Sequence, residues 1–338
     1  MSRCNVAISG FGAIGRMVAQ LLEARRPRYR ERYGVDVRLT GICRSRGGLV
    51  APDGLPAGID ALAADVSLDP ALTGAAFVAA ARPQVLIEAG PTDYRTGGAG
   101  LGYLRAALGA GAHGIAISKG ALVADYPGLR ALADANGVAL KISGATAAAL
   151  PTIDLLEYNA AGCEVYVMEG IFTATTNYVL DRMTGGAGFA EALADAQRLG
   201  MAEPDPGFDV DGSDTACKVC ILANAGFGAR LALDAIAREG IEHVSDEDLA
   251  RWRAAGLVPK LVGRIERRPD GSVGAAVQLR TYAADHPFAR VGAGMKAVRI
   301  ETDAMGELIA IGRTSPQATA AAALKDFEHL LMRGAFAA

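Results

Sequence analysis

The first 25 residues hold the feature that most constrains this chain, an apolar strand pattern that leads through a glycine-rich turn into a helix pattern. Residues 3–9 alternate and are rich in Val and Ile, Gly10-Phe11-Gly12-Ala13-Ile14-Gly15 follow at once, and residues 16–25 are helix-like. The first glycine permits a tight turn, the second lets the backbone approach a pyrophosphate, and the third lets helix and strand pack closely. We therefore predict that these six residues bind a dinucleotide, with its phosphates at the helix N-terminus.

The second predicted strand, residues 35–43, leads into Cys43-Arg44-Ser45-Arg46. In a dinucleotide fold this strand ends where the ribose is bound, and an acidic residue there favours NAD. Arginines instead suit a 2′-phosphate, because guanidinium groups bind phosphate in a bidentate manner. We expect NADP to be preferred over NAD through Arg44 and Arg46. The alternative is a disordered loop with solvated arginines.

Alternating helix and strand patterns continue from there to residue 142. They predict helices at 58–81, 101–108 and 127–136, strands at 84–89, 114–117 and 138–142, and a turn at Gly90-Pro91-Thr92. Such alternation indicates a parallel sheet with helices on both faces, which binds ligands at the carboxyl ends of its strands. Ser118 and Lys119 follow one such strand. Lys119 is therefore either a substrate-binding residue or an ordinary surface lysine.

From residue 144 onward the pattern changes to a mixed one. We expect helices at 145–157, 178–183, 189–199, 213–225 and 317–332, and strands at 164–172, 257–267, 273–281, 297–302 and 308–311. The predicted fold class is α/β, a Rossmann-type doubly wound parallel sheet plus a mixed α+β catalytic and dimerisation domain. The predicted domains are 1–143, completed by a C-terminal helix within 313–338, and a substrate-binding and oligomerisation domain at 144–312.

Composition excludes several classes of protein. A net charge of −3 over 338 residues argues against nucleic-acid binding, and we interpret the basic cluster at 25–30 as the exposed end of the first helix rather than a polyanion site. No apolar run is long enough to cross a bilayer and no signal peptide is recognisable, so we expect a cytoplasmic protein without a membrane partner. The five cysteines indicate free thiols. The pair Cys217 and Cys220 suits buried packing better than a redox or zinc site.

An acidic, proline-containing segment spans residues 200–218 and ends in a helix pattern. Asp214 and Lys218 lie four residues apart and therefore on one helix face. On its own this segment is interpreted as a solvated loop that caps a helix. With a dinucleotide fingerprint upstream and Lys119 at a strand end, a substrate cage becomes the better interpretation.

Several motifs together resemble the homoserine dehydrogenase family in its short form without a regulatory domain. They are the N-terminal fingerprint, the runs 88–92, 117–122 and 170–178, the acidic segment through Lys218 to residue 223, and His286-Pro287-Phe288-Ala289. These motifs cover most of the chain in the family's order, and the acidic segment is the most specific. The resemblance implies reversible, NAD(P)H-dependent reduction of L-aspartate 4-semialdehyde to L-homoserine, a small-molecule substrate, and a homodimer or homotetramer.

The resemblance also assigns roles to residues. Lys119 and Lys218 match the two active-site lysines, although a lysine beside a carboxylate could also be a structural ion pair. Carboxylates at Glu203, Asp209 and Asp214 match groups that bind the substrate ammonium, and Thr175 with Ala174 and the neighbouring backbone are candidates for the substrate carboxylate. The expected cofactor-binding residues are Gly10, Phe11, Gly12, Ala13, Ile14, Gly15, Arg44, Arg46, Thr92, Ser118 and Lys119.

Some positions differ from the family pattern, mainly around the expected substrate pocket. Alanines 147–149 replace a glycine-rich segment, Ser143 replaces a glutamate of a monovalent-cation site, Met201 replaces a tyrosine, Ala174 a glycine and Ser118 an asparagine. We therefore predict no metal-binding residue. Two alternatives stay open: a dehydrogenase of the same fold that acts on another small hydroxy or amino acid, and an NAD(P)-binding protein without activity.

Substitution of Arg44 tests the predicted cofactor preference. The variant Arg44→Ala should raise the Kd for NADPH about 10-fold or more and leave the Kd for NADH nearly unchanged, because only NADPH carries the 2′-phosphate. Both constants can be measured by fluorescence titration of the reduced cofactor. Equal weakening for both cofactors would contradict the prediction.

Overall fold

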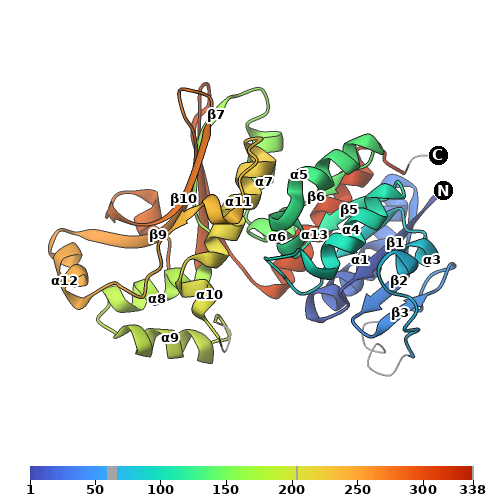
Figure 1. The fold of residues 1–338 in the computed structure, drawn as a ribbon, viewed down its shortest axis with the longest axis horizontal. Coiled ribbons are helices and arrows are strands. Elements are labelled where there is room, and N and C mark those ends of the chain that lie inside the picture. The colour runs from blue at the N-terminus through green and yellow to red at the C-terminus, as the bar shows by residue number, and fades with distance from the viewer. Residues whose placement is uncertain (59–66, 203–204, 337–338) are drawn as a thin grey trace. The chain divides into compact units, whose positions relative to one another are not determined.

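The chain folds into two compact units, each with its own sheet (Figure 1). The structure, a computed structural model, describes residues 1–58, 67–202 and 205–336. The first unit comprises Met1–Ala149 and Ser315–Ala338, and the second comprises Leu150–Thr314.

The first unit contains a six-stranded sheet in the order β3-β2-β1-β4-β5-β6. Its strands are β1 (Ser2–Ser9), β2 (Val35–Arg44), β3 (Gly47–Val50), β4 (Val85–Glu88), β5 (His113–Ala116) and β6 (Leu140–Lys141). Pairing is parallel from β2 through β6, and β3 is an antiparallel edge strand. This arrangement confirms the predicted Rossmann-type α/β fold, with an antiparallel edge that we did not expect.

Helices cover both faces of this sheet. They are α1 (Ala13–Tyr33), α3 (Gly74–Ala81), α4 (Gly98–Gly109), α5 (Gly120–Ala135), α6 (Ser143–Thr146) and α13 (Pro316–Met332). Ile8 and Ile87 point into a core formed with α1 and α13, whereas their neighbours Ala7 and Leu86 point into a core formed with α3 and α4. The period of two along each strand therefore divides the apolar residues between two helical layers.

The first helix is longer than its sequence pattern indicated. It continues through Pro27 to Tyr33 and ends at Gly34, which adopts a left-handed φ of 66°. The basic cluster consequently lies in the C-terminal part of the helix rather than at its very end. Its expected exposure is confirmed for Arg25, Arg28 and Arg30. Tyr29 within the cluster is 1% exposed and packs edge-on against Phe327 of α13, with ring centroids 5.5 Å apart. This tertiary contact extends the helix past the proline.

Asp36 contacts two arginines of this cluster together with Arg38. Arg26 and Arg30 contact its Oδ1 at 2.9 and 2.6 Å, and Arg38 Nε donates to its Oδ2 at 2.7 Å. Burial alone would raise the pKa of Asp36, but the hydrogen bonds from the three guanidinium groups outweigh it and hold the pKa well below its usual range. The cluster therefore joins α1 to β2 within the unit.

The segment after β2 also differs from expectation. Strand β2 ends at Arg44, and Ser45 and Arg46 form a two-residue turn. Gly47–Val50 of β3 then pair antiparallel with Gly41–Arg44 of β2. The predicted loop is therefore a β-hairpin. Gly47, the first residue of β3, adopts a φ of 141°, and a Cβ there would lie 2.4 Å from the Asp69 oxygen. Of the predicted helix at 58–81, residues 59–66 lie outside the described residues and only α3 is helical.

The second unit contains a six-stranded sheet in the order β12-β11-β7-β9-β10-β8. Its strands are β7 (Val165–Ile171), β8 (Ala237–Arg238), β9 (Leu257–Arg267), β10 (Val273–Ala283), β11 (Met295–Thr302) and β12 (Gly306–Arg313). All its pairs are antiparallel except that of β8 with β10. The predicted antiparallel component of this unit is confirmed.

Helices and short turns complete the second unit. They are α7 (Thr152–Asp154), the π-helix η1 (Leu155–Asn159), α8 (Ala174–Thr184), α9 (Phe189–Arg198), α10 (Gly207–Val210), α11 (Ser213–Gly226), α12 (Asp246–Ala254) and the 3₁₀ turns η2 (Leu233–Ala235) and η3 (Pro287–Arg290). Gly263 of β9 and Val219 of α11 lie in close contact, since a Cβ on Gly263 would be 2.4 Å from a Val219 methyl. Helix α11 thus packs directly on the sheet.

Two predicted helices of this region need correction, and a third helix was missed. Residues 145–157 are not one helix: α6 ends at Thr146, and Pro151 separates it from α7 because proline cannot continue a preceding helix. Helix α8 begins at Ala174, four residues before the predicted start, so Thr175 lies in its first turn. Helix α12 was missed, although Ser245 and Asp248 form a capping box that the sequence displays.

The fold also bears on two expectations drawn from the composition, one about membrane-spanning helices and one about the pair Cys217 and Cys220. Among the described residues, we find no helix that combines the length and the apolar character needed to cross a bilayer. Cys217 and Cys220 are free thiols without exposed surface in α11. Burial raises the pKa of Cys220 to about 11, as expected for a thiol that serves in packing.

Candidate active site

The glycine-rich turn of the first unit has the geometry that a dinucleotide cradle requires. Gly10 adopts φ 85°, and a Cβ there would lie 2.2 Å from the Gly90 nitrogen. A Cβ on Gly15 would lie 2.4 Å from the Gly10 oxygen. At Gly12, by contrast, a Cβ would meet no atom of the described residues within 4 Å. Packing therefore requires glycine at the first and third positions, and space for a bound phosphate explains the second.

Two buried polar groups lie beside this turn. The Ser9 hydroxyl, at the end of β1, and Arg16 Nε, in the first turns of α1, are buried without a hydrogen-bond partner among the described residues. Buried polar groups are normally paired, so unpaired ones beside a helix N-terminus fit an anionic ligand. Neither residue was predicted from the sequence, although both lie next to the glycine fingerprint, which could have indicated them. The chain's own residues thus fit a dinucleotide.

Glu88 connects the ends of two neighbouring strands. It is 1% exposed, its Oε1 accepts a hydrogen bond from the Gly90 N–H at 2.8 Å, and its Oε2 accepts one from the Ser118 hydroxyl at 2.5 Å. A Cβ on Gly100, in the first turn of α4, would lie 3.0 Å from the same carboxylate. Burial raises the pKa of Glu88, although these hydrogen bonds oppose the change. Glu88 therefore holds the turn at residue 90 and the Ser118–Lys119 corner together.

The other predicted residues of the first unit lie at or near the carboxyl ends of its strands. Lys119 is half-buried at the start of α5, and its Nζ lies 6.0 Å from the centre of the Tyr94 ring. Thr92 is half-buried in the loop after β4, Arg44 is half-buried at the end of β2, and Arg46 is exposed in the hairpin turn. The parallel sheet thus brings these segments to one edge.

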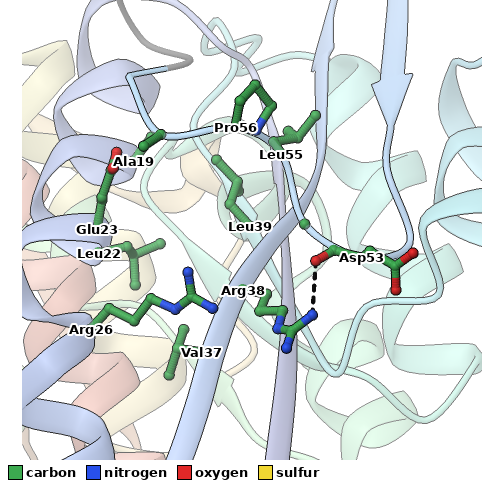
Figure 2. A pocket seen from close by; sticks show the side chains of 12 residues that line it. Ala19, Leu22, Glu23, Arg26, Val37, Arg38, Leu39, Asp53, Leu55 and Pro56 are labelled. Carbon is green, nitrogen blue, oxygen red and sulfur yellow. Dashed lines mark hydrogen bonds between the residues drawn. The ribbon is translucent and has the colours of Figure 1, made fainter.

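A cavity of about 100 Å³ in this unit lies away from the glycine-rich turn (Figure 2). It is lined by turns of α1 beyond the first and by residues 37–39 and 53–57, including Leu22, Leu39 and Leu55. Residues 37–39 belong to the amino half of β2, whereas ligands of such sheets bind at the carboxyl ends. Its arginine Arg38 is occupied by Asp36 and by the Asp53 carbonyl. This cavity is therefore separate from the cofactor cradle.

The second unit contains a buried ion pair at the start of α11. Lys218 is 7% and Asp214 8% exposed, and the lysine Nζ donates to an Asp214 oxygen and, at 2.8 Å, to the Phe172 carbonyl. Thr173 donates its hydroxyl proton to the same Asp214 oxygen at 2.9 Å. The predicted contact across one helical turn is confirmed, and the end of β7 completes it. These contacts fix the orientation of the buried ammonium.

The first turn of α8 lies near the acidic segment. The Thr175 hydroxyl donates to the Met201 carbonyl at 2.7 Å, so its proton is already used. The amide groups of Ala174, Thr175 and Thr176 belong to the helical turn whose N–H groups have no partner within the helix. Asp209 is half-buried in α10, while Glu203 lies outside the described residues. The structure thus joins Thr175 to the acidic segment through the Met201 backbone.

Two departures from the family pattern have visible structural consequences. Ala148 adopts a left-handed φ of 58°, the conformation that glycine accepts without strain and that costs other residues about 1–2 kcal/mol. Ser143 is tied to Asp326, through its backbone N–H at 2.9 Å and its hydroxyl at 2.7 Å. The backbone therefore retains a glycine-like turn at Ala148, and Ser143 serves to anchor α6 to α13.

Comparison with known proteins identifies the family. Residues 151–327 match the family model described as homoserine dehydrogenase, and residues 10–143 match the model described as the NAD-binding domain of homoserine dehydrogenase. The chain belongs to the homoserine dehydrogenase family. The resemblance inferred from the sequence motifs is thereby confirmed, and the chain is an NAD(P)-dependent oxidoreductase that acts on a CH–OH group.

Individual relatives match along nearly the whole chain. The NAD(+)-dependent homoserine dehydrogenase of Pseudomonas canavaninivorans is 32% identical, over 98% of this chain and 97% of the relative. The homoserine dehydrogenase of Methanocaldococcus jannaschii is 29% identical, over 96% and 98%. A crystal structure of a homoserine dehydrogenase from Thiobacillus denitrificans superposes with a TM-score of 0.84 at 25% identity, over 98% of this chain and 74% of that one.

The raised pKa of Glu88 generates a prediction about stability. A carboxyl whose pKa is higher in the folded than in the unfolded state loses its contribution as pH rises from the unfolded value, about 4.3, through the folded value. Glu88→Gln removes this titration and keeps the shape. Urea unfolding at several pH values should therefore show wild type losing stability relative to Glu88→Gln as pH rises. A difference that is constant from about pH 4 to about pH 9 would contradict the assignment.

Proposed function

We propose that this chain catalyses the reversible, NAD(P)H-dependent reduction of L-aspartate 4-semialdehyde to L-homoserine. The observation that carries the proposal is the buried pair of Lys218 and Asp214, which lies within the residues that match the family. Three requirements follow from the reaction: a cradle for the cofactor, a proton donor for the aldehyde oxygen, and groups for the ammonium and carboxylate of the substrate.

The glycine-rich turn and the N-terminus of α1 would hold the cofactor, and the unpaired groups of Ser9 and Arg16 support this assignment. Bound NAD(P)H supplies the hydride. The preference for NADP through Arg44 and Arg46 stays a prediction, and the P. canavaninivorans relative is named as NAD(+)-dependent. A β-hairpin presents both arginines, which gives them a defined backbone rather than a loose loop.

Lys218 is assigned the proton transfer to the aldehyde oxygen. An ammonium has three N–H donors, and the Phe172 carbonyl and Asp214 occupy two of them. Among the described residues no third acceptor contacts this ammonium, and we assign its remaining donor to an incoming oxygen, whose developing negative charge the ammonium stabilises as hydride reaches the carbon. Lys119, at the carboxyl end of β5, is assigned a share of this task.

The substrate's own charges require opposite partners. Asp209, Asp214 and Glu203 are assigned to the α-ammonium group. The carboxylate is assigned to the N–H groups at the start of α8, where a helix N-terminus favours an anion. Because the Thr175 proton is used by Met201, Thr175 contributes its N–H and anchors the neighbouring segment, rather than donating from its side chain.

The departures around the pocket favour a second candidate, namely the same chemistry on another small hydroxy or amino acid. Met201 and the strained Ala148 stand where the family has a tyrosine and a glycine-rich segment. We further propose a cytoplasmic homodimer or homotetramer built through the second unit. The exposed apolar side chains of Tyr166, Met305 and Ile311 in that unit support the proposed assembly.

Substrate analogues separate these candidates. NADP⁺ and NAD⁺ reduction should be measured with L-homoserine, with aminopropanol, which lacks the carboxylate, and with hydroxybutyrate, which lacks the ammonium. Homoserine should be turned over with a kcat/KM at least about 10-fold above either analogue, because each loses a charge-assisted contact. No turnover of homoserine beside clear turnover of another hydroxy acid would overturn the proposal.

A variant adds a control to this assay. Asp209→Asn should lower kcat/KM for homoserine about 10-fold or more and leave that for hydroxybutyrate nearly unchanged, because hydroxybutyrate has no ammonium to bind. Equal losses on both compounds would remove Asp209 from ammonium recognition without affecting the assignment of Lys218.

A further inference from the structure

The second unit contains another buried lysine, which the proposed mechanism does not use. Lys260 of β9 is 1% exposed, and its Nζ donates to Asn177 Oδ1 at 2.7 Å and to the Val291 carbonyl at 2.8 Å. Both acceptors are neutral. Burial lowers the pKa of Lys260, and the charge of Asp181 only partly offsets this effect. A cation without a hydrogen-bonded carboxylate is costly to bury, so its contacts need a physical explanation.

The first consequence of these contacts is the orientation of Asn177. Its side chain is 1% exposed in α8, and Nδ2 donates to the Gly292 carbonyl at 2.8 Å and to the Met295 carbonyl at 3.1 Å. An ammonium can only donate, so Lys260 forces the amide oxygen toward itself and the amide nitrogen toward the two carbonyls. Lys260 and Asn177 together therefore hold three carbonyls of the segment 291–295.

This segment in turn supports Met201. Gly294 adopts φ 72°, and a Cβ there would lie 2.9 Å from Met201 Cε, so the two residues are in direct contact. The Met201 carbonyl accepts the Thr175 hydroxyl from the first turn of α8. A closed path thus runs from Lys260 through Asn177 to 291–295, on to Met201, and back to α8 at Thr175.

We propose that Lys260 is a positioning residue for substrate binding. It fixes Asn177 and the segment 291–295, and through them it holds Met201 against the α8 turn that is assigned to the substrate carboxylate. This inference rests on the proposed function. Lys260 touches no reacting group in this account, since its contacts are with protein carbonyl and amide oxygens. Its loss should therefore change KM for the substrate more than kcat.

Two variants of this path test the inference. Lys260→Met keeps an unbranched side chain as far as the position of Cε and removes the ammonium, and Asn177→Asp keeps the acceptor for Lys260 but removes the donor to Gly292 and Met295. Each should raise KM for L-homoserine about 10-fold, with kcat changed less and the Kd for NADPH within about 2-fold of wild type. Asn177→Asp gains an ion pair with Lys260, so it remains informative if Lys260→Met fails to fold.

Arg264→Met is the matched control. Arg264 also lies on β9, and its replacement by Met likewise removes a cation. The contacts of Arg264, however, are with Glu169 and Glu266. It should lower the Tm without changing KM. A KM within about 2-fold of wild type for both Lys260→Met and Asn177→Asp would overturn the inference while leaving the proposed function intact. Absence of homoserine turnover by wild type in the same assay would overturn both.

Discussion

The buried ion pair of Lys218 and Asp214 is the interaction on which the rest of the second unit depends. It joins three elements, because α11 supplies both charges, the end of β7 supplies the Phe172 carbonyl, and Thr173 supplies a hydroxyl just before α8. Removal of one partner from a buried pair typically costs about 3–5 kcal/mol, since the other charge is left in a poorly solvated place. The corner between β7 and α8 is therefore fixed by the same groups that we assign to the chemistry.

Close backbone packing fixes the strand ends of the first unit in a comparable way. Gly10 and Gly15 allow contacts with Gly90 and the loop itself that a Cβ would prevent, and Glu88 fastens the next two strand ends to each other. Gly10 and Glu88 lie at strand ends, and Asp214 and Lys218 lie in the first turns of α11. Such placement limits the reorganisation needed when substrate and cofactor bind.

Local features were predictable from the sequence, and contacts between distant segments were not. The glycine fingerprint and the pairing of Asp214 with Lys218 depend on residues a few positions apart, so spacing alone revealed them. The bonds of Glu88 to Ser118 and of Lys260 to Asn177 join residues 30 and 83 positions apart. No periodicity encodes such pairs.

Some predicted helix boundaries were wrong for the same physical reason. Packing of Tyr29 on Phe327 extends α1 through Pro27, and the contacts of Thr175 and Asn177 accompany the earlier start of α8. Tertiary contacts override local propensity at these places. The Arg44–Arg46 segment is a further case, since β3, which pairs with β2 to form its hairpin, also packs against a distant residue: a Cβ on Gly47 would lie 2.4 Å from the Asp69 oxygen.

The central claim is that Lys218 supplies the proton as hydride reaches the substrate. Its most direct test is the single-turnover rate of NADPH oxidation at saturating L-aspartate 4-semialdehyde in a Lys218→Met, Asp214→Asn double variant. This variant removes both buried charges together and so avoids leaving one unpaired, and saturation prevents weaker binding of the substrate ammonium from limiting the rate. The account predicts a rate at least about 100-fold below wild type, with the Kd for NADPH within about 2-fold. A rate close to that of wild type would contradict it.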